Sequence, residues 1–132
     1  MANLSDYAEE TLNARIFGDT DSSILASDIF VALSTTLSSD DGITEPATDY
    51  ARVRCEFWTI ATDGTGLVEN TSDIEFAQAG TDWGTVLSVA IFDALTAGNM
   101  WVHGEFSDTD GYAINENDTF KISATDFQFT LA

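Results

Sequence analysis

The stretch TDWGTVLSVAIFDALTAGNMWVHGEF, from Thr81 to Phe106, contains the densest apolar run in the chain. Two apolar segments, Val86–Phe92 and Met100–Phe106, flank a short turn at Leu95–Asn99. Each segment is too short for a membrane helix, and the first is rich in the β-branched residues that favour strands. The turn contains a glycine, which adopts the positive φ that tight connections need. The stretch therefore predicts a central hairpin of an antiparallel sheet.

Several other segments have the composition of strands and are separated by turn residues. These strand candidates are Asp28–Thr36, Tyr50–Thr62, Gly66–Val68, Asp73–Phe76, Asp118–Ala124 and Thr125–Ala132. The spacing between turn signals is often near 8–12 residues, which is typical of a sandwich or barrel. The sequence predicts a mainly β fold, an antiparallel β-sandwich or barrel-like domain with one N-terminal α-helix. A chain of 132 residues without a repeat or linker is expected to form one domain, with its β part over about residues 24–132.

The segment Tyr50–Thr62 alternates most regularly. Its side chains fall on two faces, with Ala51, Val53, Cys55 and Phe57 on the first and Arg52, Arg54, Glu56 and Trp58 on the second. The pattern predicts one strand with Trp58 on the outward side as a candidate contact. Cys55 is expected to be a buried small hydrophobe, and as the only cysteine it forms no intrachain disulfide.

The N-terminus predicts an α-helix over about residues 4–17. One apolar stripe recurs every four residues, with Tyr7 beside it: Leu4, Ala8, Leu12 and Ile16. Asp6 is the expected N-cap with Glu9 three residues later, and Gly18 supplies the C-terminal stop. Two interpretations stay open. The helix covers the core of its own domain, or it is an arm that docks on a neighbouring subunit.

The chain is strongly acidic. It has 23 Asp and Glu against 4 Lys and Arg, a formal charge of −19. The cations are Arg15, Arg52, Arg54 and Lys121. We expect no binding to nucleic acid and none to membranes, because phosphate backbones and anionic lipids repel such a chain. The acids are spread along the whole chain, which favours adaptation to molar salt, where the Debye length is about 3 Å, over contact with a basic partner.

No motif of a catalytic or nucleotide-binding site occurs, whether GxSxG, GxGxxG, GxxxxGK[ST] or HExxH. His103 is the only histidine, whereas metal sites and nucleophilic triads need it combined with other groups. Its position within a strand predicts a structural role. We therefore assign no catalytic, cofactor-binding or metal-binding residue and expect no enzymatic activity.

The best metal candidate is the acidic loop SDTDGYAINEND, Ser107–Asp118. Aligned on the glycine of an EF-hand, its first ligand position falls on Phe106 and its twelfth on Asn117, so the match fails. An irregular calcium site would use Asp108, Asp110, Glu116 and Asp118. A solvated acidic loop is the favoured interpretation, and the same holds for Asp19 and Asp21.

The order of several segments along the chain resembles a known family. The segments are NLSDYAEETLNARIF, IFVALSTT, YARVRCEFW, NTSDIEFAQAGTDWGTVLSVAIFDALTAGNMWVHGEF and ENDTFKISATDFQFTLA. Together they resemble small tailed-phage virion proteins of about this length, often described as tail fibre proteins. The likeness covers nearly the whole chain and is most specific in DWGTVLSVAIFDALTAGN and in the strand start YAR. This chain departs from it in its acid excess and in the Ser107–Asp118 loop, where relatives tend to carry a plainer Pro/Thr loop.

The resemblance implies a non-enzymatic, β-rich structural protein of a virus particle, and the acid excess suggests a virus of an extreme halophile. We expect a capsid decoration or turret, or a tail or fibre component, assembled in the host cytoplasm as a homo-oligomer docked on capsid or tail proteins. The alternative is a module that binds host-surface glycans or another receptor, with Trp58, Trp83 or Trp101 as stacking platforms. Core packing competes with that role for each tryptophan. A glycan hydrolase is disfavoured because no convergent site appears.

Overall fold

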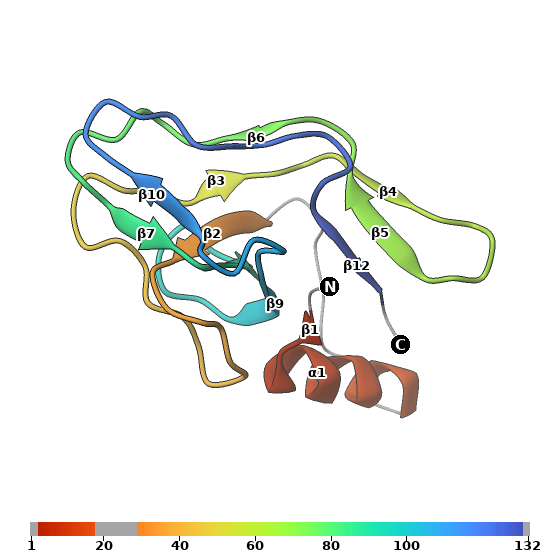
Figure 1. Ribbon diagram of the computed structural model, residues 1–132. Coiled ribbons are helices and arrows are strands. Elements are labelled where there is room, and N and C mark those ends of the chain that lie inside the picture. The colour runs from red at the N-terminus through yellow and green to blue at the C-terminus, as the bar shows by residue number, and fades with distance from the viewer. Residues whose placement is uncertain (1–2, 18–28, 131–132) are drawn as a thin grey trace.

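Antiparallel sheets make up most of the structure, with one α-helix at the N-terminus (Figure 1). The computed structural model describes residues 3–17 and 29–130. Its largest sheet has five strands in the order β1 (Asn3–Leu4), β9 (Met100–Glu105), β8 (Ser88–Phe92), β2 (Phe30–Ser34) and β3 (Val53–Arg54). The mainly β, antiparallel fold class is confirmed. The sheets do not close into a barrel within the described ranges.

Three smaller sheets complete the β structure. The first pairs β10 (Tyr112–Ile114) with β7 (Gly84–Val86), and the second pairs β11 (Lys121–Ile122) with β6 (Ile74–Glu75). The third has the order β12 (Gln128–Thr130), β5 (Leu67–Asn70) and β4 (Trp58–Ile60). We call this third sheet the arm, because its β4–β5 hairpin projects away from the five-stranded sheet in Figure 1.

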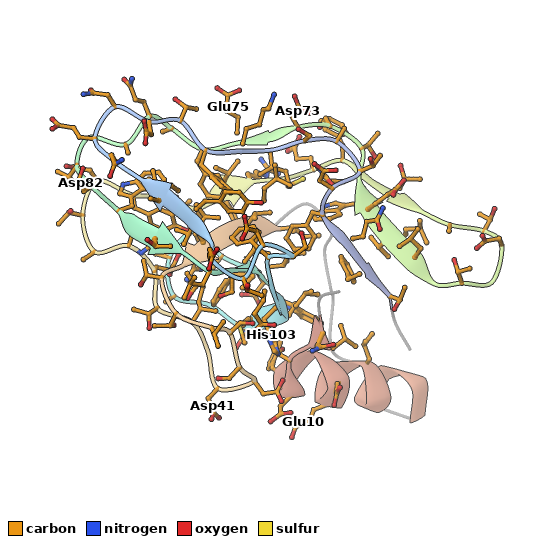
Figure 2. The ribbon with its side chains drawn as sticks, viewed as in Figure 1. Glu10, Asp41, Asp73, Glu75, Asp82 and His103 are labelled. Atoms are coloured by element: carbon orange, nitrogen blue, oxygen red, sulfur yellow. The ribbon has the colours of Figure 1, made fainter. Side chains whose placement is uncertain are left out.

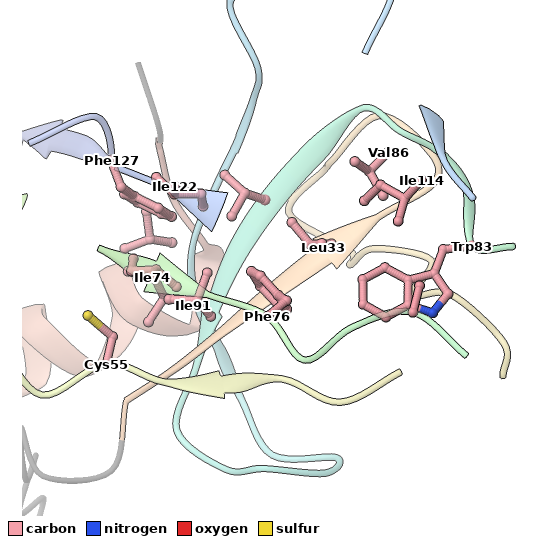
Figure 3. Close-up of a cluster of buried hydrophobic side chains, with 14 residues drawn as sticks. Leu33, Cys55, Ile74, Phe76, Trp83, Val86, Ile91, Ile114, Ile122 and Phe127 are labelled. Carbon is pink, nitrogen blue, oxygen red and sulfur yellow. The ribbon is translucent and has the colours of Figure 1, made fainter. Parts of the chain in front are cut away.

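The main hydrophobic core joins one face of the five-stranded sheet to the smaller sheets (Figure 3). The large sheet contributes Val31, Leu33, Val89, Ile91 and Val102, and the smaller sheets contribute Ile74, Val86, Ile114 and Ile122. Because neighbouring residues of a strand point to opposite faces, a second cluster forms on the other side of the large sheet. It contains Ala32, Ala90, Phe92 and Met100, with Ile43 packed against it. Both faces of the large sheet are therefore covered.

The predicted central hairpin is confirmed as β8 and β9. Ala90 lies opposite His103, and the register shifts between Ile91 and Phe92. Val86, which we had placed in the same strand as β8, belongs instead to β7 and pairs with Tyr112. The chain changes partner there because Leu87, between the two strands, donates its N–H to the carbonyl of Ser34 at 2.8 Å.

The prediction of one continuous strand over Tyr50–Thr62 is wrong. The segment contains β3 and β4, which belong to different sheets. Arg52, expected on the outward face, is buried, whereas Phe57, expected in the core, is exposed. The predicted alternation fails because β3 pairs with β2, whereas β4 pairs with β5 in a different sheet. Side chains before and after this break therefore do not share the two faces of one strand.

Helix α1 (Asp6–Phe17) begins two residues later than predicted. Leu4 pairs with Val102 in the sheet instead of forming part of the helix. The N-cap is Ser5 and not Asp6, because the Ser5 hydroxyl oxygen accepts the N–H of Ala8 at 3.2 Å. Ala8 is fully buried, and α1 contacts β9 of its own chain. The expected stop at Gly18 lies outside the described residues.

The two C-terminal strands are shorter than predicted, and a turn separates them. Thr125 has a φ of 69°, so it cannot continue a strand. Buried Asn70 organises this turn. Its side-chain amide donates to the carbonyls of Ser72 at 2.9 Å and Ser123 at 3.0 Å, and its side-chain oxygen accepts the N–H of Phe127 at 2.9 Å. The side chain of Asn70 thus joins β5 of the arm to the turn that precedes β12.

Candidate functional site

All three tryptophans pack against the main hydrophobic core, but to different depths. Trp83 is buried, and its indole N–H donates to the carbonyl of Asp49 at 3.2 Å. Trp58 is half-buried and meets Phe127 edge-to-face, with ring centroids 5.5 Å apart. Trp101 is half-buried and meets Tyr7 at 5.1 Å in the same manner. Trp83 is therefore a core residue. The prediction that Trp58 lies on the outward face of its strand is wrong.

The structure contains a groove lined by aromatic side chains, which the sequence did not predict. Its volume is about 790 Å³. Val89 and Gly104, which face each other across β8 and β9, line it together with side chains from the C-terminal third of the chain. Three of its rings form one cluster, because Phe106 lies 5.2 Å from Tyr112 and 5.8 Å from Phe120, centroid to centroid.

The groove also carries hydrogen-bonding groups. The polar side chains that line it are Glu105, Ser107, Tyr112, Thr119, Lys121, Asp126 and Gln128. Tyr112 is 42% exposed, so part of this residue is accessible to a ligand. Aromatic surface beside carboxylate, amide and hydroxyl groups suits a ligand with both apolar and hydroxyl faces, such as a sugar. Periodicity had no means of finding this groove, because its residues come from five separate segments.

His103 is a buried side chain that joins two distant segments. Its Nδ1 lies 3.0 Å from the Ser38 hydroxyl, and its Nε2 lies 2.9 Å from Asp40 Oδ1. The Ser38 hydroxyl in turn donates to Glu105 at 2.9 Å. Because carboxylates only accept and Ser38 has one hydroxyl proton, all three bonds form together when both ring nitrogens carry a proton. The cluster thus ties the loop after β2 to β9.

The arrangement of these groups does not prepare Ser38 as a nucleophile. A serine that donates its proton to Glu105 keeps no proton for the imidazole to remove. In Figure 2, His103 lies inside the molecule, whereas the labelled acids Glu75, Asp82 and Asp41 lie around its periphery. The geometry accords with the structural role predicted for His103.

Arg52 is the buried cation of the described chain. Its Nε and Nη2 donate to the two carboxylate oxygens of Glu45, each at 2.9 Å. Its Nη1 donates to the carbonyls of Ala94 at 2.8 Å and Ala97 at 2.7 Å, and its guanidinium lies 3.7 Å from the centre of the Phe92 ring. These contacts fasten the β8–β9 turn to the loop that precedes β3, a role that the sequence did not indicate.

The acidic loop Ser107–Asp118 uses its carboxylates to hold its own turns. Asp108 accepts the N–H of Asp110 at 3.1 Å, and Asp118 accepts the N–H of Asn115 at 2.9 Å. Glu116 donates its backbone N–H to Asp82 at 2.7 Å. Over residues 3–17 and 29–130, no three His, Cys, Asp or Glu side chains gather in a group able to hold a metal ion. Asp19 and Asp21 lie outside these ranges.

The edge of the arm exposes large apolar side chains. Ile60 of β4 is 67% exposed and Phe57, directly before β4, is 62% exposed. Strand β4 has β5 on one side, and the order β12-β5-β4 puts no described strand on the other. A second hollow, of about 390 Å³, lies beside Phe57 and is lined by Cys55, Ser72 and Ile74 among others. Apolar side chains on an open strand edge form a candidate surface for protein association.

The described part of the chain contains no helix of the length and apolarity that crossing a membrane requires. A comparison with curated proteins finds none that matches. A family model does match, described as Podophage GP4 fiber I protein gp80, and its match extends over residues 3–130. This range includes every strand and the helix of the structure. The chain therefore belongs to the family of the podophage GP4 fiber I protein gp80 and is a phage fibre structural protein.

Proposed function

We propose that this chain is a non-enzymatic structural subunit of a virus particle, which forms a homo-oligomer and docks on capsid or tail proteins of the virion. The observation that carries the proposal is the family match over residues 3–130. A fibre subunit must bind its neighbours, and the exposed apolar edge of the arm supports such a contact. A formal charge of −19 makes binding to nucleic acid or to an anionic membrane unfavourable.

The number of copies of this protein per particle distinguishes its possible positions on the particle. A capsid decoration or turret protein is present in tens to hundreds of copies, whereas a tail fibre is present in few. We favour an exposed fibre because the family description names one. Quantitative mass spectrometry of purified particles, calibrated on the major capsid protein, measures the number. A cryo-electron microscopy map then locates the subunit, and its absence from purified particles would contradict the proposal.

The charge supports a particle that works in concentrated salt, and we propose that the particle is assembled in the host cytoplasm. Carboxylates spread over the surface repel one another when the Debye length is about 30 Å at 0.01 M salt, and far less when it is about 3 Å at 1 M. The melting temperature should therefore rise from millimolar to molar salt, equally in sodium and potassium chloride. If the melting temperature does not change with salt concentration, the halophilic interpretation is wrong and contact with a basic partner is favoured. A rise with millimolar calcium alone would indicate a calcium site in the Ser107–Asp118 loop.

A second candidate function is binding of a host-surface glycan in the aromatic groove. The observation that favours it is the ring cluster with exposed Tyr112 beside Gln128 and Asp126. The acidic surface favours neutral or amino sugars over anionic ones. A glycan array in molar salt tests this function, with Tyr112→Ala as the variant that should lose binding. Trp83→Phe is the control, because Trp83 is buried away from the groove lining.

A further inference from the structure

Gly104 is a glycine at a position where the backbone does not require one. It lies inside β9, and it is not among the glycines of positive φ. Its partner across the sheet is Val89, in a register that runs without a shift from Ser88 to Ile91. Glycine in a strand interior weakens the strand, and it marks a bulge, a bend or a place where a ligand or another backbone comes close. Because the register is regular at Gly104, the glycine indicates that space is needed beside this strand.

The space beside Gly104 belongs to the aromatic groove, which Gly104 and Val89 both line. Side chains two residues apart on a strand share a face, so a side chain at position 104 would share the face of Phe106, which also lines the groove. The buried members of the lining are Val89, Gly104, Ile122 and Phe127. We call these four residues the floor of the groove. Any residue larger than glycine at position 104 would make the groove shallower.

The backbone of Gly104 offers the groove no free hydrogen-bonding group. Phe106 donates its N–H to the carbonyl of Leu87, on the β8 side of β9, at 3.1 Å. Every second residue of an antiparallel strand faces the same neighbour, so Gly104 also directs its N–H and its carbonyl toward β8, where Val89 lies opposite. The other floor residues have apolar side chains. The part of a ligand that reaches the floor must therefore be apolar.

The exposed part of the lining is polar and acidic. It offers hydroxyl, amide and carboxylate groups, from Ser107, Tyr112, Thr119, Gln128, Glu105 and Asp126. Its one cation among the described lining residues, Lys121, lies 3.6 Å from the carboxylate of Asp73. Such a rim suits the hydroxyl groups of an uncharged ligand and repels an anionic one.

We propose that the aromatic groove binds a neutral sugar that carries a methyl group, and that Gly104 is the residue that admits this methyl group to the floor. Deoxy sugars and N-acetylated sugars both present a methyl group beside hydroxyl groups. The methyl group packs on Val89, Ile122 and Phe127, and the hydroxyl groups bond to the rim. The inference rests on glycan binding, the second candidate function, and names the class of sugar that the groove takes.

Matched sugars test the ligand class on the unaltered protein. L-Fucose differs from L-galactose in having a methyl group instead of a hydroxymethyl group, and N-acetylglucosamine differs from glucose in its acetamido group. In NMR titrations in molar salt, the methyl-bearing sugar of at least one pair should bind at least about fourfold more tightly, the gain expected from burying one methyl-sized group. The pair that differs distinguishes a deoxy sugar from an N-acetylated one. Equal dissociation constants within both pairs would overturn the methyl preference.

Gly104→Ala tests the floor. It should raise the dissociation constant of the preferred sugar at least about tenfold, because the added methyl group takes the place of the ligand's. It should leave the melting temperature unchanged or higher, because alanine costs less than glycine inside a strand. A lower melting temperature would show that close packing within the protein requires the glycine, and would overturn the role of Gly104.

Gly80→Ala is the matched control for this variant. Gly80 is also absent from the glycines of positive φ, and it lies outside the groove lining. A Cβ atom there would meet Asp49 at 3.4 Å, an ordinary contact distance. We therefore expect Gly80→Ala to keep both the affinity for the sugar and the melting temperature.

The outcomes separate this inference from the functions on which it builds. If the wild-type protein binds no sugar, glycan binding and this inference are both overturned, whereas the structural role in the particle is unaffected. If Tyr112→Ala loses sugar binding but Gly104→Ala keeps it, glycan binding stands and the role of Gly104 is overturned. Loss of binding in both variants, with full binding by Gly80→Ala, supports the inference.

Discussion

The five-stranded sheet and the arm differ in how completely their apolar strands are buried. In the sheet, β2 and β8 have partners on both sides and side chains packed on both faces. In the arm, β4 has one partner among the described strands, and its Ile60 is largely exposed. Most of the folding free energy should therefore reside in the sheet and its core, whereas the arm leaves apolar surface exposed. The following substitutions test this division.

The largest expected effect is at Phe76, which is almost fully buried in the main core and stacks on Tyr50. Phe76→Ala should lower the free energy of unfolding by about 3–5 kcal/mol, because it removes a large buried ring and leaves a cavity. Ile60→Ala should change it by less than about 0.5 kcal/mol in the monomer. Denaturant titrations of both variants measure the difference. Equal losses would show that the arm is as important to folding as the core.

The next effect concerns Arg52, which fastens the β8–β9 turn. Arg52→Ala leaves the Glu45 carboxylate and two carbonyls without their donor. We expect a loss of about 2–3 kcal/mol, below the 3–5 of a fully buried pair, because Glu45 is 28% exposed. Arg52→Lys should recover only part of it, since an ammonium cannot reproduce the planar fork. Thermal melts in molar salt check both variants, and a full recovery by lysine would show that charge alone matters.

A smaller effect is expected at Ser5, which caps α1 against the edge of the sheet. Its hydroxyl donates to the carbonyl of Met100 and accepts the N–H of Ala8. Ser5→Ala should cost about 1 kcal/mol, the usual value of an N-cap. Asp6→Ala, at the originally expected cap, should cost less. The reverse order in chemical denaturation would return the cap to Asp6.

The smallest effect is a pH dependence at Asp93 in the β8–β9 turn. Burial raises the pKa of Asp93, but hydrogen bonds from the backbone and side chain of Asn99 and from Trp101 outweigh burial and lower it. A lowered pKa in the folded protein adds stability above the ordinary carboxyl pKa near 4, and this is lost as the pH falls through the folded value. Asp93→Asn should therefore destabilise the protein at neutral pH and lose its effect in acid. Melting temperatures of both proteins across that range measure it.

At Tyr50, unlike at Asp93, the effect of burial on the pKa outweighs that of hydrogen bonding. Burial raises the pKa of the Tyr50 hydroxyl, which accepts the N–H of Leu33 at 2.7 Å. Together with its ring contacts to Phe76 and Trp83, this bond attaches the segment before β3 to the middle of β2. In β4 the bond between ring and backbone is local, because the indole N–H of Trp58 donates to the carbonyl of Cys55, three residues earlier, at 3.1 Å. The contrast between sheet and arm thus extends to their polar contacts.

The amino-acid sequence by itself determined the fold class, the central hairpin and the N-terminal helix. These are local properties, because β-branched runs, a glycine-containing turn and an apolar repeat act through neighbouring residues. The strong acidity and the likeness to phage fibre proteins could also be recognised from the sequence. For the same reason, Leu95–Asn99 was placed correctly as a turn without knowledge of what packs around it.

Only the tertiary structure decided where strands change partner and which side chains meet. Alternation in Tyr50–Thr62 predicts one strand, but pairing with β2 and then with β5 divides it and reverses the environments of Arg52 and Phe57. The aromatic groove and the His103 cluster join residues that are tens of positions apart, and no local period encodes such contacts. The open edge of β4 has the same origin, because whether a strand lies in the middle or at the edge of a sheet depends on the partners that the whole chain supplies.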